Sequence, residues 1–251
     1  MPSRLNAYLV CGGKYHDMDF ARLEILKLLA EHEHVRVRVG EDYRDTAAIE
    51  RADFLITYTC DVIPEDAEQD ALARFLESGK RWFALHGTNS VLRFVRGRGW
   101  DAPRVAPRFM QMLGSQFIAH PPIQPYRVTV ADPAHPLVAG IEPFEADDEL
   151  YLCEYHGTTH ALLETRFTGE GTGFVESDWS RDEPRLVMYL HACGPGEVLY
   201  LTLGHCRGHY DMQPMIDYYP TVERGSWNVP VFYELLRRGI RWAGRIEREE
   251  P

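Results

Sequence analysis

The residues of this chain best suited to chemistry are its eleven histidines, because the imidazole pKa lies near neutrality and its nitrogens also bind metals. Four of them come directly after stretches that resemble strands: His16, His86, His205 and His209. In a parallel sheet the loops at the carboxyl ends of the strands meet at one edge, so such residues can share a pocket. His120 and His156 also follow predicted strands, whose direction is open. His32 and His34 lie in an acidic helix end and are interpreted as solvated.

The segment Leu85–Ser90 predicts a sharp turn from an apolar strand into a short helix. In α/β hydrolytic folds such a turn presents the nucleophile, beside backbone N–H groups that stabilise an oxyanion. The residue at the tip here is His86, not Ser or Cys. The alternative interpretation is an ordinary tight turn in which Gly87 relieves backbone strain.

A second group of polar residues follows the last predicted strand. His205 and His209 are four residues apart, a spacing that could chelate a metal from a helix. Gly204 and Gly208 favour a loop instead, in which the spacing means little. Cys206 beside His205 resembles a nucleophile–base pair, although adjacent side chains usually point apart.

An acidic run, Glu145–Glu149, enters a predicted strand. Such runs are usually solvated, but one carboxylate, for which Glu149 is the candidate, could act as a base or a metal ligand. The long loop before the last helix carries aromatic residues that either stack on a sugar ring or pack the loop onto its own domain: Tyr210, Tyr218, Tyr219 and Trp227. Arg207 and Tyr210 are the candidate sugar-binding residues of this region.

Strand and helix signals alternate over the first 90 residues, which is the pattern of a parallel sheet with helices on both faces. The predicted strands are Asn6–Cys11, Val35–Val39, Asp53–Tyr58, Arg81–Leu85, Gln124–Ala131, Glu149–Cys153, Leu186–Leu190 and Val198–Leu203. The predicted helices are one capped by Asp17, then Thr46–Glu50, Pro64–Ser78 and the closing Val229–Ala243. Thr168–Asp182 is expected to be a loop, and residues 1–251 to form a single domain.

Charge and cysteine content narrow the class of protein. A net charge of -11 argues against a nucleic-acid partner, since phosphate binding needs a basic face. The five cysteines are odd in number and contain no C-x-x-C pair, which favours a reducing compartment. Met1–Leu9 lacks the apolar run of a signal peptide, and no stretch reaches the roughly 20 apolar residues of a membrane span. We therefore expect a cytoplasmic protein without a membrane partner.

Three common motifs are missing from the sequence. Neither G-x-x-x-x-G-K-[ST] nor G-x-G-x-x-G occurs, so nucleotide binding has no support, and there is no H-E-x-x-H of a zinc protease.

Six segments, taken in order, resemble motifs of the ThuA-like (trehalose-utilisation) proteins. They are Gly12–Asp17, Leu85-His86, Gly114–Phe117 with His120-Pro121, Val128–Pro136 followed by Asp148–Tyr151, Gly194–His205, and Gly239–Ala243. The resemblance spans almost the whole chain. It implies a flavodoxin-like α/β fold with a largely parallel central sheet, related to class I glutamine amidotransferases. Ser115 replaces a glycine of the commoner form of the third segment.

The related amidotransferases use Cys, His and Glu, and the resemblance puts His86 at the nucleophile position and His205 near the triad histidine. An imidazole cannot form the thioester that glutamine hydrolysis needs, so we expect that activity to be lost. The family is linked to sugar catabolism. The first hypothesis is therefore a carbohydrate-processing enzyme that acts on a sugar or keto-sugar, with His86 and His205 as an acid–base pair supported by Glu149. The expected substrate-binding residues are His16, His120, His156, Arg207 and Tyr210.

Two alternatives stay open. One is a non-catalytic sugar-binding or regulatory protein on a degenerate amidotransferase scaffold, and the other is amidase chemistry through Cys206. We expect His16, His86, His120 and His205 to converge on one pocket, with His156 or Glu149 at its edge. Imidazoles with one carboxylate suit zinc or a similar divalent ion, but imidazoles also hydrogen-bond sugar hydroxyls. The expected partner is a small-molecule carbohydrate, and a homo-oligomer is left open.

Overall fold

The structure, a computed structural model, describes residues 4–247. The predicted domain, residues 1–251, extends beyond the described residues at both ends. The strands are β1 (Leu5–Gly13), β2 (Val35–Gly40), β3 (Phe54–Cys60), β4 (Arg81–Leu85), β5 (Arg93–Val95), β6 (Gly99–Asp101), β7 (Ser115–Ala119), β8 (Gln124–Val130), β9 (Phe144–Asp148), β10 (Leu152–Tyr155), β11 (Thr159–Arg166), β12 (Gly169–Glu170), β13 (Asp178–Trp179), β14 (Pro184–Cys193) and β15 (Gly196–Leu201). The helices are α1 (Met18–Leu29), α2 (Thr46–Arg51), α3 (Asp66–Glu77), α4 (Pro107–Leu113) and α5 (Pro230–Gly244), with the short 3₁₀ turns η1 (His86–Asn89) and η2 (Gly225–Asn228).

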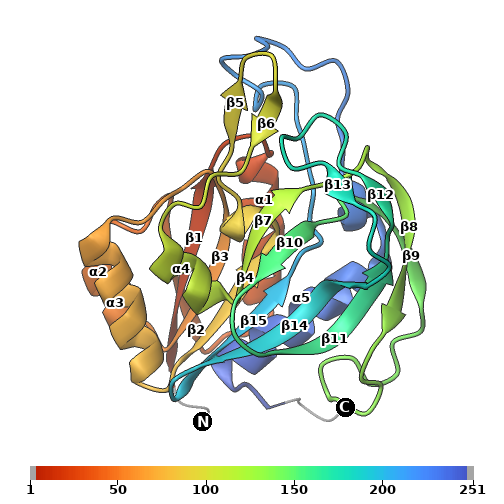
Figure 1. The fold of residues 1–251 in the computed structure, drawn as a ribbon. Helices are drawn as coiled ribbons and strands as arrows, with labels where there is room; N and C mark the ends of the chain where they lie inside the picture. The colour runs from red at the N-terminus through yellow and green to blue at the C-terminus, as the bar shows by residue number, and fades with distance from the viewer. Residues whose placement is uncertain (1–3, 248–251) are drawn as a thin grey trace.

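Within residues 4–247 the main sheet has nine strands in the order β2-β1-β3-β4-β15-β14-β11-β8-β9 (Figure 1). The strands from β2 to β15 are parallel to one another. From β15 onward, β14, β11, β8 and β9 pair antiparallel. The predicted α/β fold is confirmed, with β4 near the middle of the sheet, and the antiparallel half extends the parallel one on the side of β15.

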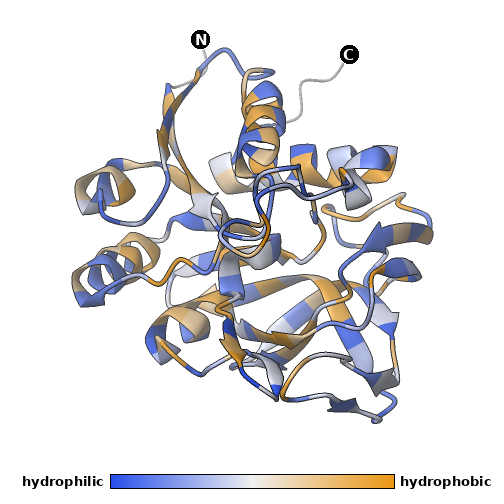
Figure 2. Cartoon of the chain, turned by 90° about the horizontal axis from the view of Figure 1, so that it is seen from above, coloured by the Kyte–Doolittle hydropathy of each residue, from blue (hydrophilic) through white to orange (hydrophobic). Residues whose placement is uncertain are grey.

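Helices cover both faces of the parallel half, as predicted. Side chains alternate along β4, so Phe83 packs with α1 and α5 on one face. Trp82 points the opposite way and packs with α2, α3 and α4. This period of two is what a strand buried on both faces requires. The helices in Figure 2 carry both hydrophilic and hydrophobic residues, as expected for helices that are buried on one side only.

The predicted helix boundaries agree closely with the structure. The Asp17 side chain caps α1 by accepting a hydrogen bond from the backbone N–H of Phe20 at 3.1 Å. No helix among the described residues is long and apolar enough to cross a membrane.

Two sequence predictions need correction. The strand predicted at Glu149–Cys153 is wrong at its start, because β9 ends at Asp148 and β10 begins at Leu152. Glu149 therefore lies in the short link between two strands of different sheets, where its side chain is not constrained by a ladder. The predicted loop Thr168–Asp182 contains the two-residue strands β12 and β13, which pair with each other.

Close packing between α5 and β4 gives a test of the fold. A Cβ on Gly239 would lie 2.3 Å from ring carbons of Phe83, which is fully buried. We expect Gly239→Ala to destabilise the protein by about 1–3 kcal/mol, although alanine is the better helix former. Leu23→Ala on the exposed side of α1 should change the free energy of unfolding by less than about 0.5 kcal/mol. Urea denaturation of the two variants measures both, and equal stabilities would contradict the packing.

Candidate functional site

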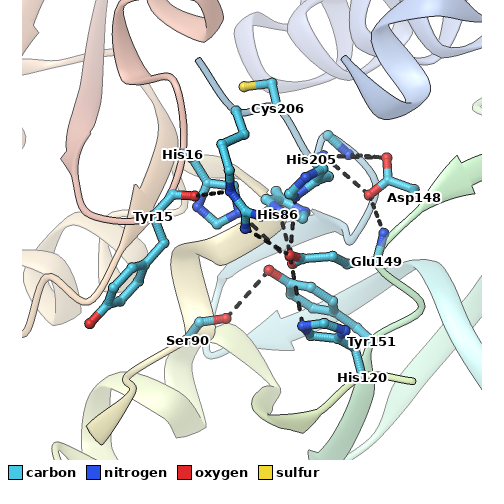
Figure 3. Close-up of polar contacts among 12 residues, drawn as sticks. Tyr15, His16, His86, Ser90, His120, Asp148, Glu149, Tyr151, His205 and Cys206 are labelled. Carbon is cyan, nitrogen blue, oxygen red and sulfur yellow. Dashed lines mark hydrogen bonds and ion pairs between the residues drawn. The ribbon is translucent and has the colours of Figure 1, made fainter. Parts of the chain in front are cut away.

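Four buried side chains meet at the carboxyl edge of the parallel strands: His16, His86, Glu149 and His205. One ligand atom from each lies within 4.8 Å of the other three. They come from the loop after β1, from η1, from the link between β9 and β10, and from the loop after β15. Figure 3 shows the three imidazoles gathered around the Glu149 carboxylate. We call these four residues the His/Glu cluster.

His86 occupies the tight turn that the sequence predicted at the end of β4. Its φ is +45° and it is completely buried, a left-handed conformation that is strained for any residue but glycine. The Tyr200 hydroxyl holds the turn, because it donates to the His86 carbonyl at 2.5 Å and accepts from the Asn89 N–H at 2.9 Å. Gly87 is required by space, since a Cβ there would lie 2.6 Å from the Thr59 carbonyl oxygen.

Backbone carbonyls set the orientation of two imidazoles. His86 Nδ1 lies 2.8 Å from the Thr202 carbonyl oxygen, and His16 Nδ1 lies 3.3 Å from that of Lys14. A carbonyl only accepts, so in each neutral ring Nδ1–H is the donor and Nε2 carries the lone pair. The two Nε2 atoms are 2.8 Å apart. Two lone pairs this close repel unless a proton or a cation lies against them.

Burial lowers the pKa of both rings, that of His86 well below its usual value and further through the neighbouring His16. For His16 the nearby Glu149 carboxylate offsets only part of the effect of burial on the pKa. Two facing Nε2 lone pairs are an arrangement that can also hold a metal cation, which accepts lone pairs from neutral imidazoles.

His205 presents the opposite arrangement, because its Nε2 lies 2.7 Å from Glu223 Oε2 and its Nδ1 faces the cluster. Among the described residues this buried Nδ1 has no hydrogen-bond partner. Glu149 Oε1 is only 3.1 Å away, but the contact does not have the geometry of a hydrogen bond. Burial lowers the pKa of His205, but Glu149, Glu223 and Asp148 outweigh it and raise the pKa to about 10. The ring is thus either an imidazolium between carboxylates or, once Nδ1 has lost its proton, a metal ligand.

The Glu149 carboxylate is the negative centre of the cluster. Its oxygens lie 3.5 Å from His86 Nε2 and 3.8 Å from His16 Nε2. Burial raises its pKa, but His205 and then His120 outweigh that effect, so the pKa of Glu149 lies well below the usual value. Glu149 is ionised at neutral pH and supplies a charged oxygen to any cation or substrate at the site.

Asp148, the residue before it, is a structural anchor. Its carboxylate is 1% exposed and accepts hydrogen bonds from the backbone N–H groups of Glu149, Gly204, His205 and Ser226 at 2.8–3.2 Å. Burial raises the pKa of Asp148, and His205 and these donors oppose the shift. One side chain thereby ties the β9–β10 link, the loop after β15 and η2 together.

Arg207 brings a positive charge to the edge of the cluster. Its guanidinium lies 3.9 Å from Glu149 Oε1 and 3.4 Å from Glu223 Oε2, and its Nε donates to the Tyr15 carbonyl at 3.5 Å. Burial lowers the pKa of Arg207, but the two glutamates outweigh it and the pKa is raised. Arg207 therefore stays charged beside the cluster.

The two other histidines predicted for the site, His120 and His156, lie at different distances from the cluster. His120 lies at the edge of the cluster, 3.8 Å from Glu149 Oε1, and its side chain is 23% exposed. Of the two residues predicted for the pocket edge, Glu149 joins the cluster and His156 does not reach it. The reason is the antiparallel pairing of β7 with β10, which puts His120 and His156 at opposite ends of that ribbon. The His156 N–H instead donates to the Gly114 carbonyl.

A cavity of about 480 Å³ opens beside His16. It lies between residues 12–19, which lead from β1 into α1, and residues 208–213 of the loop after β15. Tyr210 and His209 line this cavity rather than the cluster, and Tyr210 is 68% exposed. Near the top of Figure 1 the loop before α5 and the β5–β6 hairpin project above the sheet on this side.

Cys206 is unsuited to act as a nucleophile. Its thiol is buried, and burial raises its pKa to about 12. The sulfur lies 3.2 Å from the Tyr58 hydroxyl, and Figure 3 shows it directed away from the histidines. Adjacent side chains point apart here, as the sequence analysis anticipated, so amidase chemistry through Cys206 has no structural support.

The comparisons with known proteins agree with this architecture. The model of the ThuA family, described as trehalose utilisation, matches residues 8–218. A ThuA-like protein from Parabacteroides merdae is 14% identical with a TM-score of 0.68, over 99% of this chain and 93% of that one. A ThuA-like protein from Bacteroides uniformis is 17% identical with a TM-score of 0.67, over 96% and 91%. A cold-adapted β-galactosidase from Rahnella sp. R3 shares the fold at a TM-score of 0.57 and 12% identity, over 98% of this chain but 32% of its own. No curated protein matches the chain.

Replacing Asp148 tests the anchor. In Asp148→Asn one oxygen becomes an NH₂ group that faces backbone donors, so at least one buried N–H loses its acceptor. We expect a loss of about 2–3 kcal/mol in the free energy of unfolding. Asp147→Asn changes the exposed neighbour and should have almost no effect. Chemical denaturation of both variants gives the comparison, and similar stabilities would show that the Asp148 carboxylate is not an anchor.

Thiol accessibility gives a second test. All five cysteines lie in the described part of the chain, four are buried and Cys193 is partly exposed. A maleimide should therefore label Cys193 in the native protein, and the other four only after unfolding, as mass spectrometry of tryptic peptides would show. Rapid native labelling of Cys206 would restore the thiol hypothesis.

Proposed function

The chain belongs to the ThuA (trehalose utilisation) family, and on that premise we propose that it acts on a sugar or keto-sugar at the His/Glu cluster, which holds a divalent, zinc-like metal. The observation that carries the proposal is the inward orientation of the four donors. In His16 and His86, Nδ1 faces a backbone carbonyl, and in His205, Nε2 faces the Glu223 carboxylate. The other nitrogen of each ring points into the cluster and is available for a shared cation. The family name supports a carbohydrate as the ligand.

The donor set fits such an ion. Three imidazoles and one carboxylate are the ligands that zinc and similar divalent metals take. Partners outside the ligands, here two backbone carbonyls and Glu223, are the usual second layer of a metal-bound histidine. Within residues 4–247, two carboxylates with lowered pKa, Glu149 and Glu223, lie 3.9 and 3.4 Å from the guanidinium of Arg207. The electrostatic environment therefore favours an added positive charge.

A bound metal of this kind would polarise a carbonyl or hydroxyl oxygen of the sugar. The residues next to the cluster supply the remaining functions. His120 is the imidazole at the edge with an exposed face, and it would exchange a proton with the substrate. Arg207 would bind negative charge that develops on a substrate oxygen. The cavity beside His16 offers space for the rest of the carbohydrate.

A metal-free version of the same function is favoured by a second observation. The pKa of His205 is raised to about 10 while that of His86 lies well below its usual value. Two groups whose pKa values are driven apart form an acid and a base, so His205 would donate a proton and His86 would accept one. A sugar-binding protein without turnover is the third reading, and the deep burial of the cluster is what supports it.

Metal content separates the first two versions. Protein purified without chelator or nickel resin should carry about one equivalent of a divalent metal, and zinc added to stripped protein at 100 times its dissociation constant should stabilise it by about 2.7 kcal/mol. His86→Ala and His205→Ala should abolish both effects, whereas His160→Ala, at an exposed histidine of β11 outside the cluster, should keep them. If wild type carries less than a tenth of an equivalent of metal, and added zinc does not change its melting temperature, the metal version is refuted and the metal-free version of the function remains.

Turnover separates an enzyme from a binding protein. Wild type is incubated with trehalose and with keto-derivatives of it, and products are followed by NMR. We expect conversion of at least one of these sugars, and a loss of about 100-fold or more in kcat/KM in His86→Ala. If calorimetry detects binding of one of these sugars to wild type, but NMR detects no product from any of the sugars, the non-catalytic hypothesis is supported.

A further inference from the structure

Glu223 lies on the outer side of the His205 ring, opposite the cluster. His205 Nε2 and Glu223 Oε2 are 2.7 Å apart, and the ring itself is 1% exposed. A carboxylate only accepts hydrogen bonds, so at this distance His205 Nε2 carries the proton that Glu223 accepts. No sequence motif pointed to Glu223, and it is more than fifteen positions from the histidine it contacts.

Both oxygens of Glu223 are held in place. The Tyr219 hydroxyl donates to Oε1 at 2.8 Å, and Arg207 Nη1 lies 3.4 Å from Oε2. The backbones of Arg207 and Glu223 pair through two hydrogen bonds of 2.9 Å. Residues 208–222 therefore form a loop whose two ends are joined at this pair, and the carboxylate sits at the joined ends.

The backbone of His205 is fixed by a different residue. The backbone N–H groups of His205 and Gly204 both donate to the Asp148 carboxylate. Loss of the Glu223 carboxylate thus leaves the His205 main chain in position, while the ring loses the acceptor that decides which nitrogen faces outward.

We propose that Glu223 is a positioning residue for the metal, which holds His205 with Nε2–H outward and the Nδ1 lone pair directed at Glu149 and His16. This inference rests on the proposed function, because it assigns Nδ1 as a metal ligand. Metal-bound histidines commonly donate their other N–H to a carboxylate, which fixes the tautomer and makes the ring a stronger ligand. Here the carboxylate comes from the end of the loop that also lines the cavity.

The test compares zinc affinity, by competition with a chromophoric chelator, among four proteins. Glu223→Ala should bind zinc about 10–100-fold more weakly than wild type. Glu223→Gln keeps an oxygen acceptor without the charge and should fall between the two. The matched control is Glu24→Ala, because Glu24 also accepts from a tyrosine hydroxyl, that of Tyr233, and pairs with a cation, Lys27, but contacts no histidine of the cluster. Glu24→Ala should bind zinc like wild type, and a Glu223→Ala affinity within twofold of wild type would overturn the inference.

A second readout does not depend on zinc. In metal-free, ¹⁵N-histidine-labelled protein, the His205 Nε2–H should give a downfield, slowly exchanging proton signal that is lost in Glu223→Ala and kept in Glu24→Ala. Wild type that binds no zinc but shows this pattern would refute the metal part of the proposed function and retain the orientation of His205 by Glu223. Absence of the signal in wild type would overturn the assignment of Glu223, whatever the zinc result.

Discussion

Two adjacent carboxylates, Asp148 and Glu149, are buried at the end of β9, and much of the site follows from how they are stabilised. A buried charge is tolerated only when hydrogen bonds or opposite charges replace the lost water. Asp148 is satisfied by backbone N–H groups from three chain segments. Glu149 lies 3.1 Å from His205, whose pKa is raised to about 10, and 3.9 Å from the guanidinium of Arg207. The first residue thereby shapes the backbone of the site, and the second collects its side chains.

The position of β15 in the sheet explains why these segments meet. It pairs parallel with β4 on one side and antiparallel with β14 on the other. His86 and His205 follow the neighbouring parallel strands β4 and β15, so their loops lie side by side at the carboxyl edge. Asp148 reaches the same edge from the antiparallel half, at the end of β9. The cluster therefore lies where the two halves of the sheet meet.

Sequence reasoning located the parts of this site that depend on regular structure. His16, His86 and His205 were found because each follows a strand whose hydrophobic pattern is clear, and parallel strands bring their carboxyl ends together. The turn at His86 was found because an apolar strand leads directly into it. In the fold, the parallel half and both helical layers were predictable for the same reason, since local periodicity encodes them.

The remaining parts depend on register and on irregular segments, which have no periodic signal. The separation of His156 from the cluster could not be predicted, because the antiparallel pairing of β7 with β10 cannot be read from either strand alone. Glu223 and Tyr219 lie in a loop without pattern, and only the fold brings them to His205. The direction of each imidazole, finally, is set by single carbonyl groups such as that of Thr202, which are invisible in the sequence.

The paired ends of the loop at residues 208–222 separate two tasks of this segment. Arg207 and Glu223 close the loop with two backbone hydrogen bonds and turn their side chains toward the cluster, while the first part of the loop, within residues 208–213, lines the cavity. Lengthening such a closed loop has little effect on the entropy of closure. A change in the length or composition of this loop would therefore reshape one wall of the cavity without moving the two residues that contact the cluster.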